Sequence, residues 1–208
     1  MSAGRFLTLE GGEGVGKSTQ ARALVTALEA RGIHAVLTRE PGGSEGAEAI
    51  RALLMQGDVR RWSAHAEALL FAAARADHVE KLIRPTVDAG SWVICDRFLD
   101  STRAYQGAQG IDDAAILALH GFGSRGLLPD RTLWLTLPEG EGDARARARD
   151  GAAADRFAAR DDEFHRSVAA TFDRIAEAEP DRVRRIDASG AVEQVTVRLI
   201  DAIADLLP

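Results

Sequence analysis

A glycine-rich run near the N-terminus has residue types and a spacing that define its chemistry. Residues 11–18 read Gly-Gly-Glu-Gly-Val-Gly-Lys-Ser, which fits the pattern G-x-x-x-x-G-K-[ST]. Glycines allow successive backbone N–H groups to turn towards one anion, and a helix that begins at Lys17 adds the positive end of its dipole. In such a loop the lysine reaches the β and γ phosphates of a nucleoside triphosphate, and the Ser18 hydroxyl ligates Mg²⁺. The expected phosphate-binding residues are Gly11, Gly12, Glu13, Gly14, Val15, Gly16, Lys17, Ser18 and Thr19.

A second chemical group, Asp96-Arg97-Phe98, follows an apolar run that is typical of a buried strand. Alone, this group is as consistent with a surface ion pair as with a catalytic site. Beside a phosphate loop, however, a carboxylate at a strand end can hold Mg²⁺ through a water molecule, and the arginine can lie between two phosphates. We therefore expect Mg²⁺ as a cofactor, with Ser18 as one ligand and Asp96 as a second ligand through water.

A third pair, Phe71 and Arg75, is four residues apart and so lies on one face of an expected helix. A flat apolar ring and a forked donor suit a nucleobase, which offers a face for stacking and a carbonyl for hydrogen bonding. Taken singly, Phe71 is also consistent with a core residue and Arg75 with a solvated charge.

Residues 139–160 are rich in Gly, Ala, Asp and Arg and have no apolar stripe that could attach them to a core. We expect this segment to be a mobile lid. It carries Arg145, Arg147 and Arg149 at alternate positions, with Arg156 further on. Arginines on a closing lid can stabilise the charge of a phosphoryl group in transfer. Because arginine is abundant throughout the chain, any one of them is also consistent with a solvated loop.

The elements that must position these groups alternate between strands and helices. The expected strands are Arg5–Glu10, Ala35–Thr38, Ser91–Cys95, Thr132–Leu137 and Val183–Ile186. The expected helices are Lys17–Arg31, Ser44–Met55, Ala64–Ala89 with a kink or tightened turn at Pro85, Asp112–Phe122 and Ala191–Leu207. This alternation predicts an α/β fold of three layers, in which a central parallel five-stranded sheet is flanked by helices. We expect residues 1–208 to form a single domain with a lid at about 139–160.

Composition excludes several classes of protein. The net charge of −6 and the pI near 5.4 argue against binding to nucleic acid or to an anionic membrane. The single cysteine, Cys95, rules out an intrachain disulfide and fits a core position. The first ten residues show no signal-peptide pattern, and the longest apolar stretch, Ala68–Ala74, is too short to cross a bilayer. We therefore expect a cytoplasmic protein.

The histidines carry no chemistry that the sequence can define. His65, His78 and His120 are scattered without the spacing of metal ligands, so no metal site is assigned to them.

Four motifs together resemble the bacterial thymidylate kinase family, which belongs to the P-loop nucleoside monophosphate kinases. They are residues 10–19, Thr38-Arg39-Glu40-Pro41-Gly42-Gly43, Asp96-Arg97-Phe98 and Ser101-Thr102-Arg103-Ala104-Tyr105-Gln106-Gly107. The similarity extends from Phe6 to residues 186–188. The resemblance implies a P-loop NTPase fold and transfer of the γ-phosphate of ATP to dTMP, which yields ADP and dTDP for dTTP biosynthesis. It also implies Mg²⁺ as cofactor and a homodimer.

The resemblance further implies roles for individual residues. Arg97 matches the arginine that grips the acceptor phosphate, Phe71 the ring that stacks on thymine, and Arg75 the arginine that bonds a thymine carbonyl. Glu13 matches an acidic residue at the sugar 3′-hydroxyl, and Tyr105 a ring that crowds the place of a 2′-hydroxyl. The implied catalytic residues are Lys17, Arg97, Arg149 and Arg156. The implied dTMP-binding residues are Glu13, Arg39, Phe71, Arg75, Arg97, Ser101, Tyr105 and Gln106.

Two other functions stay open at the level of the sequence. A kinase for another nucleoside monophosphate would share the phosphate loop, because few contacts read the base. A nucleotide-dependent binding module would need the loop but no acceptor pocket. The chain has no Asn-Lys-x-Asp motif for guanine, and the lack of a basic stripe argues against a nucleic-acid ATPase.

Overall fold

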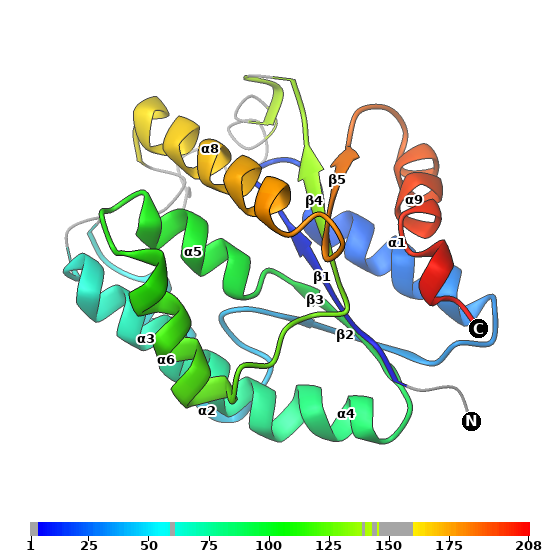
Figure 1. Ribbon diagram of the computed structural model, residues 1–208, viewed down its shortest axis with the longest axis horizontal. Helices are drawn as coiled ribbons and strands as arrows, with labels where there is room; N and C mark the ends of the chain where they lie inside the picture. Colours follow the sequence, from blue (N-terminus) through cyan, green and yellow to red (C-terminus); the bar gives the residue numbers. More distant parts are fainter. Residues whose placement is uncertain (1–3, 59–60, 139, 143–144, 146–159) are drawn as a thin grey trace.

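A parallel sheet forms the middle layer of the molecule. The computed structural model describes residues 4–58, 61–138, 140–142, 145 and 160–208. In this part of the chain the strand order is β2-β3-β1-β4-β5, and every pairing is parallel (Figure 1). The strands are β1 (Phe6–Glu10), β2 (Ala35–Arg39), β3 (Trp92–Asp96), β4 (Arg131–Thr136) and β5 (Val183–Asp187). The predicted α/β fold with a central five-stranded parallel sheet is thus confirmed.

Helices cover both faces of this sheet. On one face lie α1 (Lys17–Glu29) and α9 (Val192–Asp201), which pack against each other (Figure 1). The helices on the opposite side are α2 (Glu45–Met55), α3 (Ala64–His78), α4 (Arg84–Asp88), α5 (Leu99–Gly107), α6 (Asp113–Ser124) and α8 (Asp162–Ala178). Among them, α2 and α6 pack on α3, and α5 packs on α8.

The central strands β1 and β3 are largely apolar on both sides because both faces of the sheet are covered there. Along β1, Leu7 and Leu9 enter the core under α1 and α9, whereas Phe6 enters the core on the other face. The same alternation divides Ile94 from Val93 on β3. Continuous apolar strands of this kind are typical of a parallel sheet buried on both faces. In the part of the chain that the structure describes, no helix has the length and apolar character needed to cross a membrane.

The predicted helix Ala64–Ala89 is divided into three pieces. Helix α3 ends at His78, a π-helical turn η1 occupies Val79–Ile83, and α4 begins at Arg84. Pro85 explains the division, because proline has no N–H for the carbonyl four residues earlier and its ring displaces that carbonyl. The wider π turn absorbs the mismatch without ending the helical direction.

Two helices near the site were not expected from the sequence, and several expected boundaries shift, of which the end of the last helix shifts most. Helix α5 contains the residues that follow Phe98, and α8 buries Phe164, Val168 and Phe172 at helical spacing. The terminal helix α9 ends at Asp201 instead of continuing to Leu207, and a separate 3₁₀ turn, η3, spans Ala204–Leu206.

The order of the strands brings three chemical groups to one edge of the sheet. Asp96 at the end of β3 is in register with Leu9 on β1 and with Arg39 on β2. The phosphate loop follows β1, and the loop that begins with Glu40 follows β2. Since all the strands are parallel, their carboxyl ends meet at the same edge, where ligands bind in open α/β sheets.

Candidate active site

The phosphate loop begins directly after β1 and ends at the first turn of α1. Gly11, Gly14 and Gly16 have φ values of 137°, 68° and 92°, in the region that disfavours other residues. A Cβ on Gly11 would lie 2.5 Å from the Leu135 carbonyl oxygen, so this glycine also permits a close approach to β4. Val15 instead buries its side chain in the core and offers only its backbone to a ligand. The loop therefore has the curvature that phosphate binding needs.

Lys17 lies buried at the start of α1, and its Nζ donates to the Gly12 carbonyl at 2.5 Å. Burial, together with the positive charge of Arg97, lowers the pKa of Lys17 to about 8. Carboxylates at Glu13, Asp96 and Glu10 partly oppose this effect. Burial destabilises the charged form of Lys17, and an anion beside it would stabilise that form again. This suits the lysine to binding phosphates.

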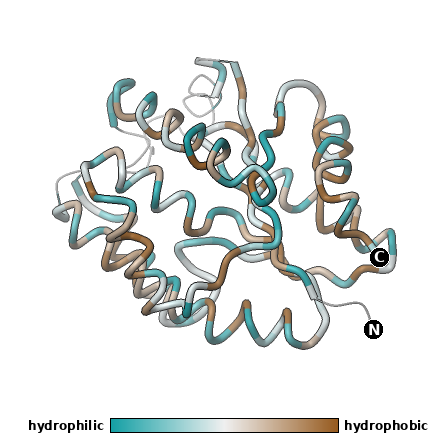
Figure 2. The backbone as a smooth tube through the Cα atoms, viewed as in Figure 1, coloured by the Kyte–Doolittle hydropathy of each residue, from teal (hydrophilic) through white to brown (hydrophobic). Residues whose placement is uncertain are grey.

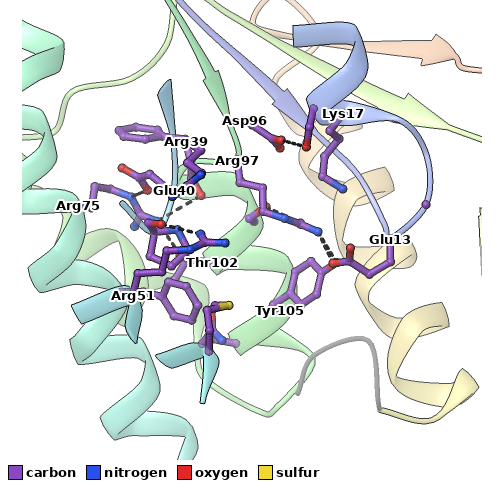
Figure 3. A pocket seen from close by; sticks show the side chains of 18 of the residues that line it. Glu13, Lys17, Arg39, Glu40, Arg51, Arg75, Asp96, Arg97, Thr102 and Tyr105 are labelled. Atoms are coloured by element: carbon purple, nitrogen blue, oxygen red, sulfur yellow. Dashed lines mark hydrogen bonds and ion pairs between the residues drawn. The ribbon is translucent and has the colours of Figure 1, made fainter. Parts of the chain in front are cut away.

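Ser18 and Asp96 are brought together from α1 and β3. The Ser18 hydroxyl donates to Asp96 Oδ2 at 2.5 Å, so one hydroxyl and one carboxylate face the same space (Figure 3). Hard oxygen donors of this kind fit Mg²⁺. Within the described residues there is no group of three or more His, Cys, Asp or Glu side chains that could hold a metal by itself. The donor set therefore fits an ion that takes its other ligands from phosphates and water.

Arg97 lies at the centre of the site. Its Nη1 donates to the Gly11 carbonyl and to Ser101 Oγ, each at 3.1 Å, and its Nη2 donates to Glu13 Oε1 at 2.5 Å (Figure 3). The guanidinium also lies 5.0 Å from the centre of the Tyr105 ring. The backbone of Arg97 has φ 70°, which costs energy for a residue with a side chain. Strain held at one residue next to a phosphate loop is typical of a functional position.

Glu10 holds the turn that carries Arg97. Its carboxyl group is buried and accepts the Phe98 N–H at 2.7 Å and the Ser101 hydroxyl at 2.5 Å. Burial, with a smaller contribution from the negative charge of Asp100, raises the pKa of Glu10 to about 7. Because Ser101 donates its single hydrogen to Glu10, its lone pairs are free to accept the Arg97 N–H. Glu10 thus orients Arg97 through Ser101.

Phe71 and Arg75 line the other end of the same cavity, which has a volume of about 360 Å³. Arg75 is 2% exposed and bonds Glu40 and Thr102. The aromatic ring and the guanidinium come from successive turns of α3, as their spacing predicts.

The structure brings most of the predicted residues around this one cavity. Those that line it are Glu13, Gly14, Gly16, Lys17, Ser18, Thr19, Arg39, Phe71, Arg75, Asp96, Arg97, Ser101, Tyr105 and Gln106. Gly11, Gly12 and Val15 do not line this cavity, and of these three Gly11 contributes a positive φ to the turn of the loop. Gln106 donates its amide to Glu67 at 2.8 Å. The predicted lid at 139–160 is described only at 140–142, 145 and 160, so Arg149 and Arg156 lie outside the described residues.

Sequence reasoning gave no role to six residues that line the cavity: Glu40, Pro41, Arg51, Met55, Phe98 and Thr102. Arg51 lies on α2 and donates to the Pro41 carbonyl at 2.7 Å. Thr102 faces the cavity because α5 is a helix, in which Thr102 lies three residues before Tyr105 and four before Gln106 and so shares a face with them. The sequence gives no apolar stripe for α5, so this position of Thr102 could not be read from the periodicity. The position of Arg51 depends on how α2 packs on α3, for which the sequence holds no local signal.

Comparisons with known proteins point to one family over nearly the whole length of the chain. The family model described as thymidylate kinase matches residues 9–199. The thymidylate kinase of Rhizorhabdus wittichii is 62% identical over 206 residues, which cover 99% of this chain and 99% of the relative. That of Caulobacter vibrioides is 49% identical over 210 residues, covering 100% of this chain and 99% of the relative. A crystal structure of thymidylate kinase from Ehrlichia chaffeensis has a TM-score of 0.79 and 31% identity, over 97% of this chain and 99% of that chain.

Proposed function

The chain belongs to the thymidylate kinase family and is an ATP-dependent kinase that phosphorylates dTMP to dTDP, and we propose that the cavity described above holds both reacting phosphates. The observation that carries the proposal is the position of Arg97. Its guanidinium bonds the backbone of the phosphate loop on one side and the residues of the acceptor pocket on the other. One cation thus lies where a donor and an acceptor phosphate would meet.

On the donor side, we propose that the phosphate loop and Thr19 surround the phosphates of ATP. Lys17 would leave the Gly12 carbonyl, to which it now donates, and bond the β and γ phosphates. Helix α1 begins after its N-cap residue Gly16, and the positive end of its dipole lies at the same place.

On the acceptor side, we propose that Phe71 stacks on thymine and that Arg75 donates to a thymine carbonyl. Arg97 would exchange its bond with Glu13 for a bond to the dTMP phosphate, which leaves the Glu13 carboxylate for the sugar 3′-hydroxyl. Tyr105, whose ring lies against Arg97, would border the deoxyribose. The remaining proposed contacts to dTMP come from Arg39, Ser101 and Gln106, all on the wall of the cavity.

We propose Mg²⁺ as the cofactor, held by the Ser18 hydroxyl and, through water, by Asp96. When bound, the ion would neutralise charge on the phosphates in transfer. The protein's own contribution is to orient a ligand: Asp96 accepts the hydrogen of the Ser18 hydroxyl and so keeps the Ser18 oxygen directed at the cavity. Little covalent chemistry is required of the protein, since phosphoryl transfer depends mainly on alignment and charge.

The Mg²⁺ proposal predicts the behaviour of an Asp96→Asn variant. The substitution keeps the size of the side chain and removes its charge, so we expect activity to fall by about 10–100-fold and the Mg²⁺ needed for half-maximal rate to rise. The measurement is ADP release in a coupled assay with ATP and dTMP across a Mg²⁺ titration. Asp88→Asn, at the exposed end of α4, is the control. An Asp96→Asn enzyme with wild-type Mg²⁺ dependence would remove Asp96 from the metal site.

We propose that the chain forms a homodimer through the surface of α3 and α6. These helices pack on each other and expose Leu69 (55%), Leu117 (39%) and Phe122 (93%). Figure 2 shows hydrophobic stretches along the same two helices. Large apolar side chains that are this exposed favour a protein partner over water.

A Phe122→Asp variant tests the dimer. We expect light scattering at micromolar concentration to give about twice 22.3 kDa for the wild type and 22.3 kDa for the variant, because a buried carboxylate at an interface is costly. Val197→Asp, on an exposed position of α9 at the opposite face of the sheet, should leave the mass unchanged. A wild type that is already a monomer would refute the proposal.

Three further proposals concern the domain, the lid and the cell compartment. We propose that residues 1–208 form one kinase domain and that residues 139–160 act as its lid. Arg149 and Arg156 would then supply positive charge to the phosphoryl group in transfer. We also propose that the enzyme acts in the cytoplasm, which agrees with the absence of a signal-peptide pattern at its start.

A further inference from the structure

Arg75 is held by a set of buried contacts that the proposed reaction does not itself require. Its Nε donates to Glu40 Oε2 at 2.8 Å, and its Nη2 donates to Thr102 Oγ1 at 2.7 Å and to the Phe98 carbonyl at 3.2 Å (Figure 3). The guanidinium also lies 5.1 Å from the centre of the Phe98 ring. These bonds engage Nε and Nη2 and leave Nη1 for a ligand in the cavity that Arg75 lines.

Glu40 is itself fixed from a second direction. Its other carboxylate oxygen, Oε1, is 3.1 Å from Nδ1 of His78, which is fully buried on α3. The opposite ring nitrogen, Nε2, is 2.7 Å from the hydroxyl of Thr38 on β2. An ionised Glu40 can only accept, so Nδ1 carries a hydrogen, and in the neutral ring Nε2 accepts the Thr38 hydroxyl. The result is a continuous buried chain of bonds from Thr38 through His78 and Glu40 to Arg75.

The loop that carries Glu40 is shaped around this histidine. A Cβ on Gly43 would lie 2.3 Å from His78 Nε2 and 2.5 Å from Thr38 Oγ1, and Gly43 has φ 88°. Any side chain at this position would displace the ring. The backbone N–H of Glu40 also donates to the Asp96 carbonyl at 2.9 Å. Both the backbone and the side chain of Glu40 are therefore held, which is the condition for orienting a partner.

We infer that Glu40 and His78 are positioning residues that fix the direction of Arg75 and thereby set the selectivity of the enzyme for the pyrimidine base. The inference rests on the proposed role of Arg75 as the donor to a thymine carbonyl. A guanidinium held at Nε and Nη2 presents Nη1 in one direction beside Phe71. A base with a 4-carbonyl accepts that hydrogen, whereas a base with a 4-amino group meets it with another donor. Discrimination of this kind is strong only where the protein group cannot turn away.

The test compares dTMP with dCMP as acceptors, using coupled ADP release at saturating ATP. The variant His78→Leu removes both ring bonds, and His78→Asn keeps a donor near the position of Nδ1. For His78→Leu we expect KM for dTMP to rise about 10-fold and the ratio of kcat/KM for dTMP over dCMP to fall about 10-fold, since one oriented hydrogen bond is affected. KM for ATP should stay within about 2-fold, and His78→Asn should recover most of the ratio.

Two further variants separate positioning from stability. Glu40→Gln keeps the shape of the side chain and removes the charge opposite Arg75, so it should lower the same ratio even if His78→Leu does not fold. His120→Gln alters another buried histidine, which bonds the Leu127 carbonyl at 2.7 Å. We expect this control to lower the melting temperature without changing the ratio.

The outcomes distinguish this inference from the function on which it rests. If the wild type shows no preference for dTMP over dCMP, the proposed base contact is wrong. The same holds if Arg75→Met keeps the wild-type preference. If Arg75→Met loses the preference but His78→Leu and Glu40→Gln both retain it in full, the base contact stands and the positioning role is overturned. Loss of the preference in the Glu40 and His78 variants with an unchanged KM for ATP supports it.

Discussion

Replacing Arg97 by alanine is expected to lower kcat/KM for dTMP by about 10³-fold or more while the chain still folds. The guanidinium lies between the Gly11 carbonyl and Glu13, where two phosphates would meet, and its fixed charge opposes their repulsion. The fold should survive because Glu10 bonds the Phe98 N–H and the Arg97 N–H bonds the Leu9 carbonyl, and neither contact uses the Arg97 side chain. The measurement is steady-state ADP release with dTMP varied, beside circular dichroism and the melting temperature.

The controls for Arg97 address charge and geometry separately. Arg97→Lys keeps a positive charge but loses the planar fork, so we expect an activity between those of the wild type and the alanine variant. Arg22→Ala removes an exposed arginine from α1 and should leave turnover unchanged. Turnover near the wild-type level in Arg97→Ala would exclude Arg97 from the mechanism.

Replacing Lys17 by alanine is expected to reduce kcat by about 10²–10³-fold and to raise KM for ATP. The lysine is the cation that the phosphate loop supplies from a side chain, and it can reach the β and γ phosphates. Stability should not suffer. Burial and the charge of Arg97 lower the pKa of Lys17 to about 8, which means that the folded protein without nucleotide disfavours the charged side chain. Alanine is also a good residue for the first turn of α1.

The chain offers a matched control for this variant, because Lys81 is its other lysine. Lys81 is exposed on the π-helical turn and pairs with Asp77 at 2.5 Å, away from the cavity. Lys81→Ala should therefore keep wild-type turnover and KM. Equal losses in the two variants, or an unchanged rate in Lys17→Ala, would contradict the role of Lys17. ATP binding by calorimetry should show the loss of affinity directly.

The parts of the site that the sequence predicted are those whose chemistry is local. The curvature of residues 11–16 depends on Gly11, Gly14 and Gly16, which each have a positive φ, so a pattern of eight letters is enough to recognise it. Phe71 and Arg75 share a helical face because of their spacing alone. Asp96 and Arg97 follow directly from the end of an apolar strand. In each case the relevant neighbours lie within one turn or one loop.

The parts that the sequence did not predict depend on contacts between distant segments. Helix α5 has few apolar positions, because its buried face carries charged side chains. Asp100 and Arg103 bond each other, and they also bond Arg182 and Glu179 from outside the helix. A hydrophobic stripe could therefore not reveal it. Helix α8, by contrast, has a clear stripe through Phe164, Val168 and Phe172, and careful counting would have found it.

By itself, the sequence determined the phosphate loop, the alternation of strands and helices, and the kinds of side chain available for the reaction. Only the tertiary structure decided which of them meet. Because β3 lies between β2 and β1, the loop after β2 comes beside Asp96, and Glu40 reaches Arg75 and His78 on α3. His78 shows the difference most clearly, since its spacing in the sequence indicates no chemistry. Its role follows from burial against Glu40, and burial depends on the order of the strands rather than on neighbouring residues.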